Sequence, residues 1–432
     1  MATTKANTFG DMLNEYLVYD LLEEAFKEQN WLWSNCNVKK TWDGGTLIVP
    51  FQDHTANSIR MGALTAEADL NTAGYVRGSV AGYKEAYGSI YFNSRDLLDH
   101  GKVSEQNFIR LLPTQLDQLM KYMRQTVSIQ ILNGGALDSV ATGWAGGAAG
   151  TVDALHPERF SRTQFVKLVD TTGPTTATGY IRTIDKSTGE LTIYDAVTGG
   201  SLVDLTGLDD TTKIYIRDAD TTQFNSLKND LLLAANGGSD TFAGVNKLDS
   251  TFSQAIQYDA GGATGTGPDW NSGTAVTGSD ILTLVFDALR KNYQRGGSAN
   301  LAIMSFKHFS AAMLALEKGS GGFRHVKPSV NFAGYSEIEV GGVQGSIKLL
   351  GIREMDDGFI AMVDRKYMDF HCGVAPFQPL ASPEGIKYYT VRAETGYTYI
   401  TDLRLAGDFI YSNPWSATAI HNIPDYEISA IT

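Results

Sequence analysis

The longest helical pattern in the sequence runs from Ser104 to Asn133, and it constrains the fold more than any other stretch. Apolar residues recur there at spacings of three and four, which places them on one face of a helix. They are Ile109, Leu112, Leu116, Leu119, Met120, Met123, Val127 and Ile131. We predict a half-buried helix, here called the spine helix, whose core contacts come from Leu112, Leu116, Leu119, Met123 and Val127.

Residues at the ends and inside this stretch define the expected helix further. Ser104 is placed to cap its start, and Gly134 and Gly135 supply a left-handed stop. Pro113 is expected either to kink the helix or to begin a second one. From Pro113 onward, about 20 residues would span roughly 30 Å, which is enough to cross a small domain.

Length and composition indicate the fold class. A chain of 432 residues is too long for one simple core, so we expect roughly two to four domains or subdomains. The 45 Gly residues against 11 Pro, together with 20 Tyr and 19 Phe, indicate many turns and strands rather than a helical bundle. The sequence therefore predicts a mixed α+β fold.

The charge balance limits the kind of partner. The net charge is −13, from 48 acidic and 35 basic residues, so the chain as a whole would repel a phosphate backbone. Sequence-independent nucleic-acid binding is therefore not expected. An acidic surplus of this kind commonly serves solubility.

Cysteine usage and hydropathy indicate the compartment. Cys36 and Cys372 are the only cysteines, which provides neither a disulfide framework nor a four-thiolate metal site. The first residues contain no apolar signal segment, and no run approaches the roughly 18 apolar residues that a membrane span requires. We expect a protein that folds in a reducing cytoplasm and has no membrane partner.

The N-terminal region, residues 1–42, is predicted to be an arm followed by a helix. Residues 1–7 are small and polar, and residues 11–26 show an amphipathic helical pattern. The run Trp31-Leu32-Trp33 fits two functions equally well: a core contact, or an anchor that docks the arm on a neighbouring subunit.

Residues 52–84 form a long stretch with little apolar periodicity between two expected strands, 46–49 and 86–92. Loops of this length are uncommon inside compact domains and indicate either disorder or an arm that acts outside its own subunit. The flanking strands favour an extended hairpin that contacts a neighbouring copy. Its expected inter-subunit residues are Asn57, Arg60, Met61, Leu64 and Tyr75.

After the spine helix, the glycine-rich residues 134–150 are predicted to form a flexible tether. Short strands follow at 165–169, 180–184, 190–194 and 213–217, with turns between them, which indicates an inserted β-barrel or sandwich between 153 and 222. Residues 185–189 are predicted to be a hairpin turn, because the ligand spacing of a calcium loop is absent.

The rest of the chain alternates helices and strands. We predict helices at 224–233, 281–293 and 306–317, strands at 301–305, 337–340, 347–350 and 358–364, and a strand-rich end from 386 to 423. This alternation indicates an α/β subdomain.

The sequence contains no recognisable catalytic motif. It has no nucleophile elbow, no phosphate loop and no dinucleotide glycine triplet after a strand, and its seven histidines occur singly. His371 and Cys372 are adjacent on an expected strand and so point to opposite faces. We predict no catalytic, cofactor-binding or metal-binding residues, and we expect no enzymatic activity.

The order of these parts resembles the major capsid proteins of tailed double-stranded DNA bacteriophages, which have the Hong Kong 97-type fold. The likeness lies in the run Tyr87-Gly-Ser-Ile-Tyr-Phe-Asn-Ser-Arg-Asp-Leu-Leu97 and in the spine helix that ends Ile131-Leu-Asn-Gly134. It also lies in Gly351-Ile-Arg-Glu-Met-Asp-Asp-Gly-Phe-Ile-Ala-Met-Val-Asp364 and Asp408-Phe-Ile-Tyr-Ser-Asn-Pro-Trp415. The β-rich insertion is not part of the minimal family fold.

The resemblance implies a set of domains. These are an N-terminal arm and helix (1–42), an E-loop hairpin (43–98), a peripheral domain with the spine helix (99–152), an inserted β domain (153–222), an axial domain (223–385) and strands returning to the peripheral domain (386–432).

The resemblance also implies a function and partners. The chain would form hexamers and pentamers of an icosahedral shell, assembled in the host bacterial cytoplasm and present in the virion. Scaffolding, portal and decoration proteins would be partners, and packaged DNA would be contacted weakly and non-specifically. The alternative is a β-rich surface or carbohydrate-binding protein, which the absence of a signal segment and of a cysteine framework disfavours.

Overall fold

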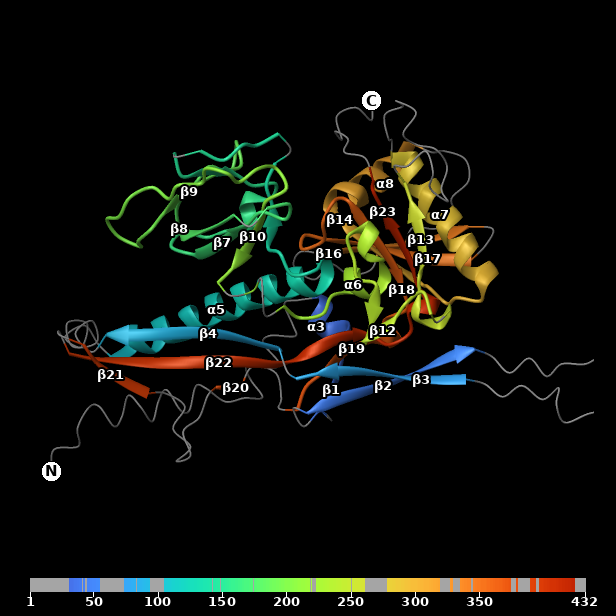
Figure 1. The fold of residues 1–432 in the computed structure, drawn as a ribbon, viewed down its shortest axis with the longest axis horizontal. Helices are drawn as coiled ribbons and strands as arrows, with labels where there is room; N and C mark the ends of the chain where they lie inside the picture. The colour runs from blue at the N-terminus through green and yellow to red at the C-terminus, as the bar shows by residue number, and fades with distance from the viewer. Residues whose placement is uncertain are drawn as a thin grey trace, which may run out of the picture. The chain divides into compact units, whose positions relative to one another are not determined.

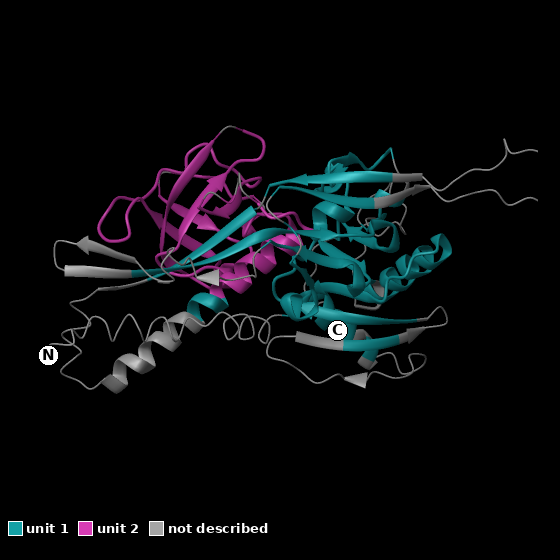
Figure 2. Ribbon diagram, turned by 90° about the horizontal axis from the view of Figure 1, so that it is seen from below, with its two compact units in different colours: residues 1–121, 227–432 teal, residues 122–226 magenta. Residues whose placement is uncertain are grey.

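The computed structural model divides the chain into two compact units, Tyr122–Ser226 and Met1–Lys121 with Leu227–Thr432 (Figure 2). The described residues are 31–40, 42, 45–54, 74–82, 84–93, 105–141, 143–147, 149–173, 175–217, 219, 223–249, 251–260, 278–318, 327–328, 335–342, 345–373, 378–379, 389–393 and 396–423. The fold is mixed α+β, as the composition predicts. The predicted helix over 11–26 lies outside the described residues.

The spine helix is α5 (Glu105–Asn133), drawn in Figure 1 as a long continuous helix. It runs without a break through Pro113, so the alternative of a second helix beginning there is wrong. Gly134 and Gly135 both have a φ of 100°, which is the left-handed stop that the sequence predicts.

The unit Tyr122–Ser226 contains a closed β-barrel. Its strands are β5 (Asp138–Ser139), β6 (Thr151–Asp153), β7 (Phe165–Val169), β8 (Thr176–Ile184), β9 (Glu190–Tyr194) and β10 (Lys213–Ile216). They are arranged in the order β5-β10-β7-β8-β9-β6, and an antiparallel bridge between Val140 and Ala154 joins the two ends. Closure leaves this sheet without a free edge. Strands β7 and β9 coincide with the predicted ones.

The predicted flexible tether at 134–150 and the predicted start of the insertion at 153 need correction. β5 lies within the tether and β6 begins before 153, while Leu137 and Val140 are buried in the barrel core. The glycines serve close packing: a Cβ at Gly146 would lie 2.0 Å from the carbonyl oxygen of Leu205. The glycines of residues 134–150 therefore indicate close backbone packing here, and not the flexible tether that the composition predicts.

The turn between β8 and β9 confirms the predicted hairpin. The backbone N–H and the hydroxyl of Ser187 both donate to the Asp185 carboxylate, at 2.9 and 2.6 Å. Gly189 closes the turn with a φ of 84°, which suits glycine. The Asp185 carboxylate is thus used within its own turn.

In the larger unit, the six-stranded sheet is built on β22 (Gly396–Tyr411), a strand of 16 residues. Its neighbours are β4 (Lys84–Asn93), β19 (Met368–His371), β20 (Gln378–Pro379) and β21 (Tyr389–Ala393), and β1 (Asn37–Lys39) pairs in parallel with β19. β4 and β22 run side by side in an antiparallel ladder (Figure 1).

The second sheet of this unit has seven strands in the order β13-β23-β18-β14-β17-β16-β15. They are β13 (Ile256–Asp259), β14 (Leu301–Ser305), β15 (Lys327–Pro328), β16 (Tyr335–Gly342), β17 (Gly345–Ile352), β18 (Phe359–Val363) and β23 (Thr418–His421). Helices α7 (Gly278–Arg295) and α8 (Phe306–Lys318) share its hydrophobic core. The predicted α/β alternation is confirmed here.

The helix predicted at 224–233 is shorter than expected, because α6 spans only Leu227–Leu231. At the end of α6, the ammonium of Lys247 donates hydrogen bonds to the carbonyl oxygens of Asn229 and Leu232. A 3₁₀ turn, η3 (Ala234–Asn236), follows. A side chain distant in sequence thus occupies carbonyl oxygens at the end of this helix.

Residues 46–81 correct the predicted long loop. β2 (Thr46–His54) pairs antiparallel with β3 (Gly74–Ala81), and together they form a two-stranded ribbon. The run 74–81 was predicted to be loop, and the strand after it, β4, pairs with β22 rather than with β2. Alternating Val and small residues in β3 gave no clear apolar period, so the strand was missed.

The tryptophan run at the start of the described chain belongs to α3 (Trp31–Asn35). Trp31, Leu32 and Trp33 are all buried, and the ring of Trp33 meets Phe370 edge-on with centroids 4.9 Å apart. Of the two functions left open by the sequence, the structure supports the core contact. This packing ties α3 to β19.

Candidate functional site

The β2–β3 ribbon is the first candidate site, because within the described part of the chain its two strands pair only with each other. Its side chains alternate: Val49 is buried and Leu47 is partly buried, whereas Ile48 between them is 58% exposed. A two-stranded ribbon is marginally stable alone. It therefore depends on what covers its two faces.

One face of the ribbon is covered near its base. Val49 forms a buried cluster with Phe242 and Ile410, and Val76 and Val80 pack against it. Phe242 lies in the hairpin of β11 (Thr241–Phe242) and β12 (Val245–Asn246). The opposite face carries the exposed Ile48.

The predicted arm residues fall mostly beyond this ribbon. Tyr75 lies in β3, where its backbone pairs with Gln52 of β2. Asn57, Arg60, Met61 and Leu64 lie outside the described residues, between the ends of the two strands. Tyr75, which we expected in a loop, therefore lies in a strand.

The predicted core residues of the spine helix differ in burial. Val127 and Met123 are 1% and 5% exposed, while Leu119 is only partly buried. The side chains of Leu112 and Leu116 lie outside the described part of the helix. Beyond the predicted stripe, Ile129 joins the barrel core, which the periodicity did not indicate.

The β4–β22 ladder carries a charged cluster on its surface. The hydroxyl of Tyr87 and the guanidinium of Arg404 both donate to the carboxylate of Glu85. The hydrogen bond from Tyr87, reinforced by Arg404, holds the pKa of Glu85 below its usual value. Since these side chains are partly exposed to water, the cluster contributes little to stability.

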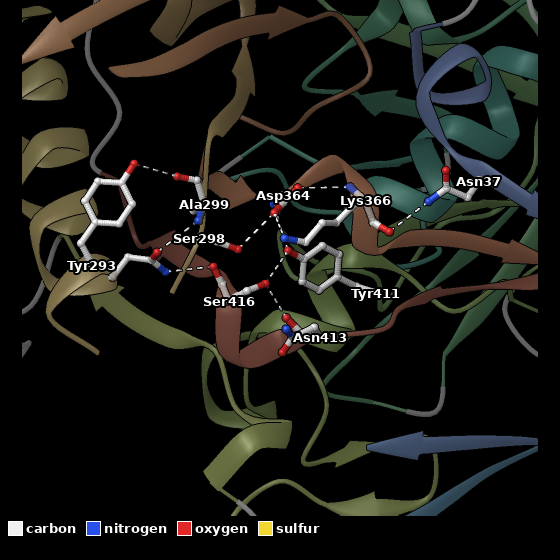
Figure 3. Close-up of polar contacts among 10 residues, drawn as sticks. Asn37, Tyr293, Ser298, Ala299, Asp364, Lys366, Tyr411, Asn413 and Ser416 are labelled. Atoms are coloured by element: carbon white, nitrogen blue, oxygen red, sulfur yellow. Dashed lines mark hydrogen bonds and ion pairs between the residues drawn. The ribbon is translucent and has the colours of Figure 1, made fainter. Parts of the chain in front are cut away.

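A buried polar network, here called the sheet junction, connects the two sheets of the larger unit (Figure 3). Tyr411, the last residue of β22, accepts a hydrogen bond at 3.0 Å from the backbone N–H of Asp364, which follows β18. The Tyr411 hydroxyl is also 3.1 Å from Ser416 Oγ, and that serine donates to the carbonyl of Asn413. Tyr411 is therefore the donor to Ser416.

The carboxylate of Asp364 organises the other side of the sheet junction. Ser298 Oγ donates to its Oδ2 at 3.1 Å, and the ammonium of Lys366 lies 2.8 Å from the same oxygen (Figure 3). The hydrogen bond to Asp364 raises the pKa of Lys366. Burial raises the pKa of Tyr411 far above its usual value, so its hydroxyl keeps its proton.

Neighbouring side chains extend the junction. The amide of Asn292 donates to the Ser416 carbonyl and to Thr418 Oγ1, both at 3.1 Å, and it accepts from the backbone of Ala299 at 3.2 Å. Asn37 donates to the Lys366 carbonyl at 3.0 Å. These hydrogen bonds connect α7, β23, β1 and the segment before β14.

The described residues offer little for catalysis. None of their His, Cys, Asp and Glu side chains form a group of three that could hold a metal ion. Burial raises the pKa of the Cys36 thiol, which disfavours the nucleophilic thiolate, and burial lowers the pKa of His371. Among the described helices, none has the length and apolar character of a membrane span.

Sequence comparison gives no relative for this chain. No protein-family model matches it, and no curated protein matches it either.

Solved structures, by contrast, resemble the chain over most of its length. A chain of the cyanophage A-1(L) capsid asymmetric unit is similar over 92% of this chain and 93% of that one, with 12% identity and a TM-score of 0.49. The capsid of an empty GTA particle is similar over 92% and 90%, with 10% identity and a TM-score of 0.42. An encapsulin complex from Synechococcus elongatus is similar over 92% and 89%, with 10% identity and a TM-score of 0.37.

Proposed function

We propose that this chain is the major capsid protein of a tailed double-stranded DNA bacteriophage, with a Hong Kong 97-type fold. In this proposal it self-assembles into the hexamers and pentamers of an icosahedral shell. The β2–β3 ribbon is the base of the E-loop, α5 is the spine helix, and the seven-stranded sheet with α7 and α8 is the axial domain.

The observation that carries the proposal is the β2–β3 ribbon. No other described strand pairs with it, and one of its faces presents Ile48 with 58% of its surface exposed. Isolated two-stranded ribbons lack the burial that offsets the entropy of ordering them. Contacts with a neighbouring copy would supply that burial, and Asn57, Arg60, Met61, Leu64 and Tyr75 are the residues we assign to them.

The rest of the larger unit suits a shell subunit that transmits load. The β4–β22 ladder pairs ten residues of each strand, from Asn93 with Thr398 to Lys84 with Gly407. The sheet junction locks the far end of β22 to the seven-stranded sheet through Tyr411 and Asp364. A rigid connection of this kind would hold neighbouring subunits at a fixed angle.

The remaining domain assignments follow from the same proposal. Residues 1–42 are the N-terminal arm and helix, 43–98 the E-loop region, 99–136 the peripheral domain with the spine helix, and 223–385 and 386–432 the axial domain and the returning strands. The inserted β domain is moved to begin at about 137, next to the first barrel strand, β5. Scaffolding, portal and decoration proteins are proposed partners.

A structural role also suits the charge and the chemistry. With a net charge of −13, the shell would contact packaged DNA weakly, so that the genome is not held against its wall. We propose no enzymatic activity and no cofactor. The protein would assemble in the host cytoplasm and remain in the virion.

Electron microscopy of the purified, recombinant chain tests the proposal. We expect uniform closed shells or tubes, formed by the chain alone or together with a scaffolding protein. A chain that remains monomeric at high concentration under both conditions would contradict it. Since a surface-binding protein would stay dispersed, the same images distinguish it from a shell protein.

A further inference from the structure

The base of the β2–β3 ribbon rests on residues 241–249 and 251–254, which we call the ribbon seat. The seat comprises the β11–β12 hairpin and the 3₁₀ turn η4 (Thr251–Ser253), and both lie against the ribbon. The backbone N–H of Ser79 in β3 donates to the carbonyl of Ala243 at 2.6 Å. This bond comes from the tip of the β11–β12 hairpin, where Ala243 and Gly244 have φ values of 47° and 79°.

The backbone conformation of the hairpin tip presents this carbonyl to the ribbon. Two consecutive residues with positive φ form the two-residue turn that matches the twist of a β-hairpin. Gly244 lies so close to the ribbon that a Cβ there would be 3.1 Å from the Ser79 carbonyl oxygen. The contact is therefore between two backbones, with little room for a side chain.

Lys247, directly after β12, holds the seat in place. It is 1% exposed, and its ammonium donates to the carbonyl oxygens of Asn229 and Leu232 at the end of α6, the second at 2.7 Å. Its backbone N–H donates to the Asp240 carbonyl at 2.8 Å. A buried ammonium with several fixed acceptors is costly to displace.

The other end of the seat is fixed independently. Phe252 packs on Trp415 with centroids 4.7 Å apart, and the guanidinium of Arg295 lies 3.6 Å from the Trp415 ring centroid. Arg295 also donates to the Gln254 carbonyl at 3.0 Å. The seat is thus anchored to α6 at one end and to α7 at the other.

We propose that the ribbon seat sets the direction in which the β2–β3 ribbon leaves its domain, and that Lys247 is the positioning residue that locks the seat to α6. Nine residues of β2 span about 30 Å, so a tilt of roughly 10° at the base would move the far end by about 5 Å. That displacement is as large as a whole strand spacing. The consequence for shell assembly rests on the proposed function, whereas the effect on the ribbon does not.

Hydrogen exchange on the unassembled full-length subunit tests the proposal. We expect Lys247→Met to accelerate exchange across 46–54 and 74–81 by roughly tenfold or more, because the seat loosens, while the barrel strands β7–β10 stay unchanged. The control is Lys186→Met, which changes an exposed lysine in the β8–β9 turn and should alter neither region. Ribbon exchange within about twofold of wild type in Lys247→Met would overturn the proposal.

A second variant covers the case in which Lys247→Met does not fold. Gly244→Ala places a Cβ against the Ser79 carbonyl and disfavours the positive φ, without touching the ammonium site. We expect faster exchange at the Ser79 amide, and unchanged exchange there would count against the seat.

Assembly assays supply the third readout. If wild type forms shells, Lys247→Met should yield fewer or irregular particles, and normal particles would overturn the assembly consequence. If wild type forms none, the proposed function fails, while the exchange result still decides whether the seat directs the ribbon.

Discussion

The backbone N–H of Asp364 donates to the hydroxyl of Tyr411 at 3.0 Å, which joins the end of β18 to the end of β22. The two residues are 47 positions apart in the chain and belong to the two different sheets of the larger unit. This single hydroxyl also contacts Ser416, so it serves three segments at once.

Tyr411→Phe should destabilise the larger unit by about 1–3 kcal/mol, because it leaves a buried backbone N–H without its acceptor. Chemical denaturation of the unassembled subunit, followed by tryptophan fluorescence, measures the change. Tyr293→Phe is the matched control: its hydroxyl is 3.5 Å from the Ala299 carbonyl and the residue is 38% exposed, so we expect a change below about 0.5 kcal/mol. Equal effects of both substitutions would argue against the sheet junction as a unit.

Because Lys247 is buried, we expect the free energy of unfolding to rise with pH. Burial lowers its pKa from the usual 10.5 to about 8, although the carboxylates of Asp230 and Asp240 oppose this shift. Between these two pH values the unfolded chain binds a proton that the folded chain does not, so the free energy of unfolding increases with pH over that window. The gain is at most about 3 kcal/mol.

The measurement is the difference between wild type and Lys247→Met at pH 7.5 and at pH 10. The other titrating groups are the same in both proteins, so their contributions to the free energy of unfolding cancel in this difference. We expect the wild type to gain stability relative to Lys247→Met as the pH rises. A constant difference would mean that the lysine is as well solvated in the folded chain as in the unfolded one.

The spine helix offers a graded test of burial. Val127 is 1% exposed and Leu119 only partly buried, so Val127→Asp should cost several kcal/mol and give insoluble protein, whereas Leu119→Asp should be milder. The soluble yield and the midpoint of thermal unfolding of the two variants measure this difference, and both should be lower for Val127→Asp. The reverse order would mean that the buried stripe is assigned to the wrong face.

The barrel predicts which fragment folds alone. Because β5 and β6 close the sheet and Ile129 contributes to its core, residues 122–226 should give the dispersed amide spectrum of a folded β domain. Residues 153–222, the boundaries that composition indicates, lack β5 and nearly all of β6 and should give a disordered spectrum. A folded 153–222 fragment would show that closure is unnecessary.

The sequence predicted elements well where one apolar period persists. The spine helix, α7, α8, β7 and β9 all have a clear spacing of apolar residues, and each lies where it was expected. The missed elements have weak or mixed patterns: β3 contains Gly74 and Gly78, and β5 has only two residues. Local sequence cannot predict these, since their strand conformation depends on partners elsewhere in the chain.

The polar residues of the junction and the seat were missed for a different reason. Tyr411 and Lys247 look like ordinary strand and loop residues, and their importance arises from hydrogen-bond partners that are 47 and 15 to 18 positions away. Nothing in the local pattern distinguishes them from exposed tyrosines and lysines.

Shortening the segment between β2 and β3 should impair shell assembly without impairing folding of the subunit. Replacing residues 55–73 with a short Gly-Ser turn keeps the Gln52–Tyr75 pair and the Val49 cluster, but removes Asn57, Arg60, Met61 and Leu64. The shortened subunit should fold with a thermal midpoint near that of the unassembled wild type, because the ribbon base and its seat are intact. Shell formation should be abolished or strongly reduced, because the contacts proposed between subunits are gone. Calorimetry and electron microscopy measure the two halves separately: normal particles would show that the tip is no assembly element, and failure to fold would place it in its own subunit's core.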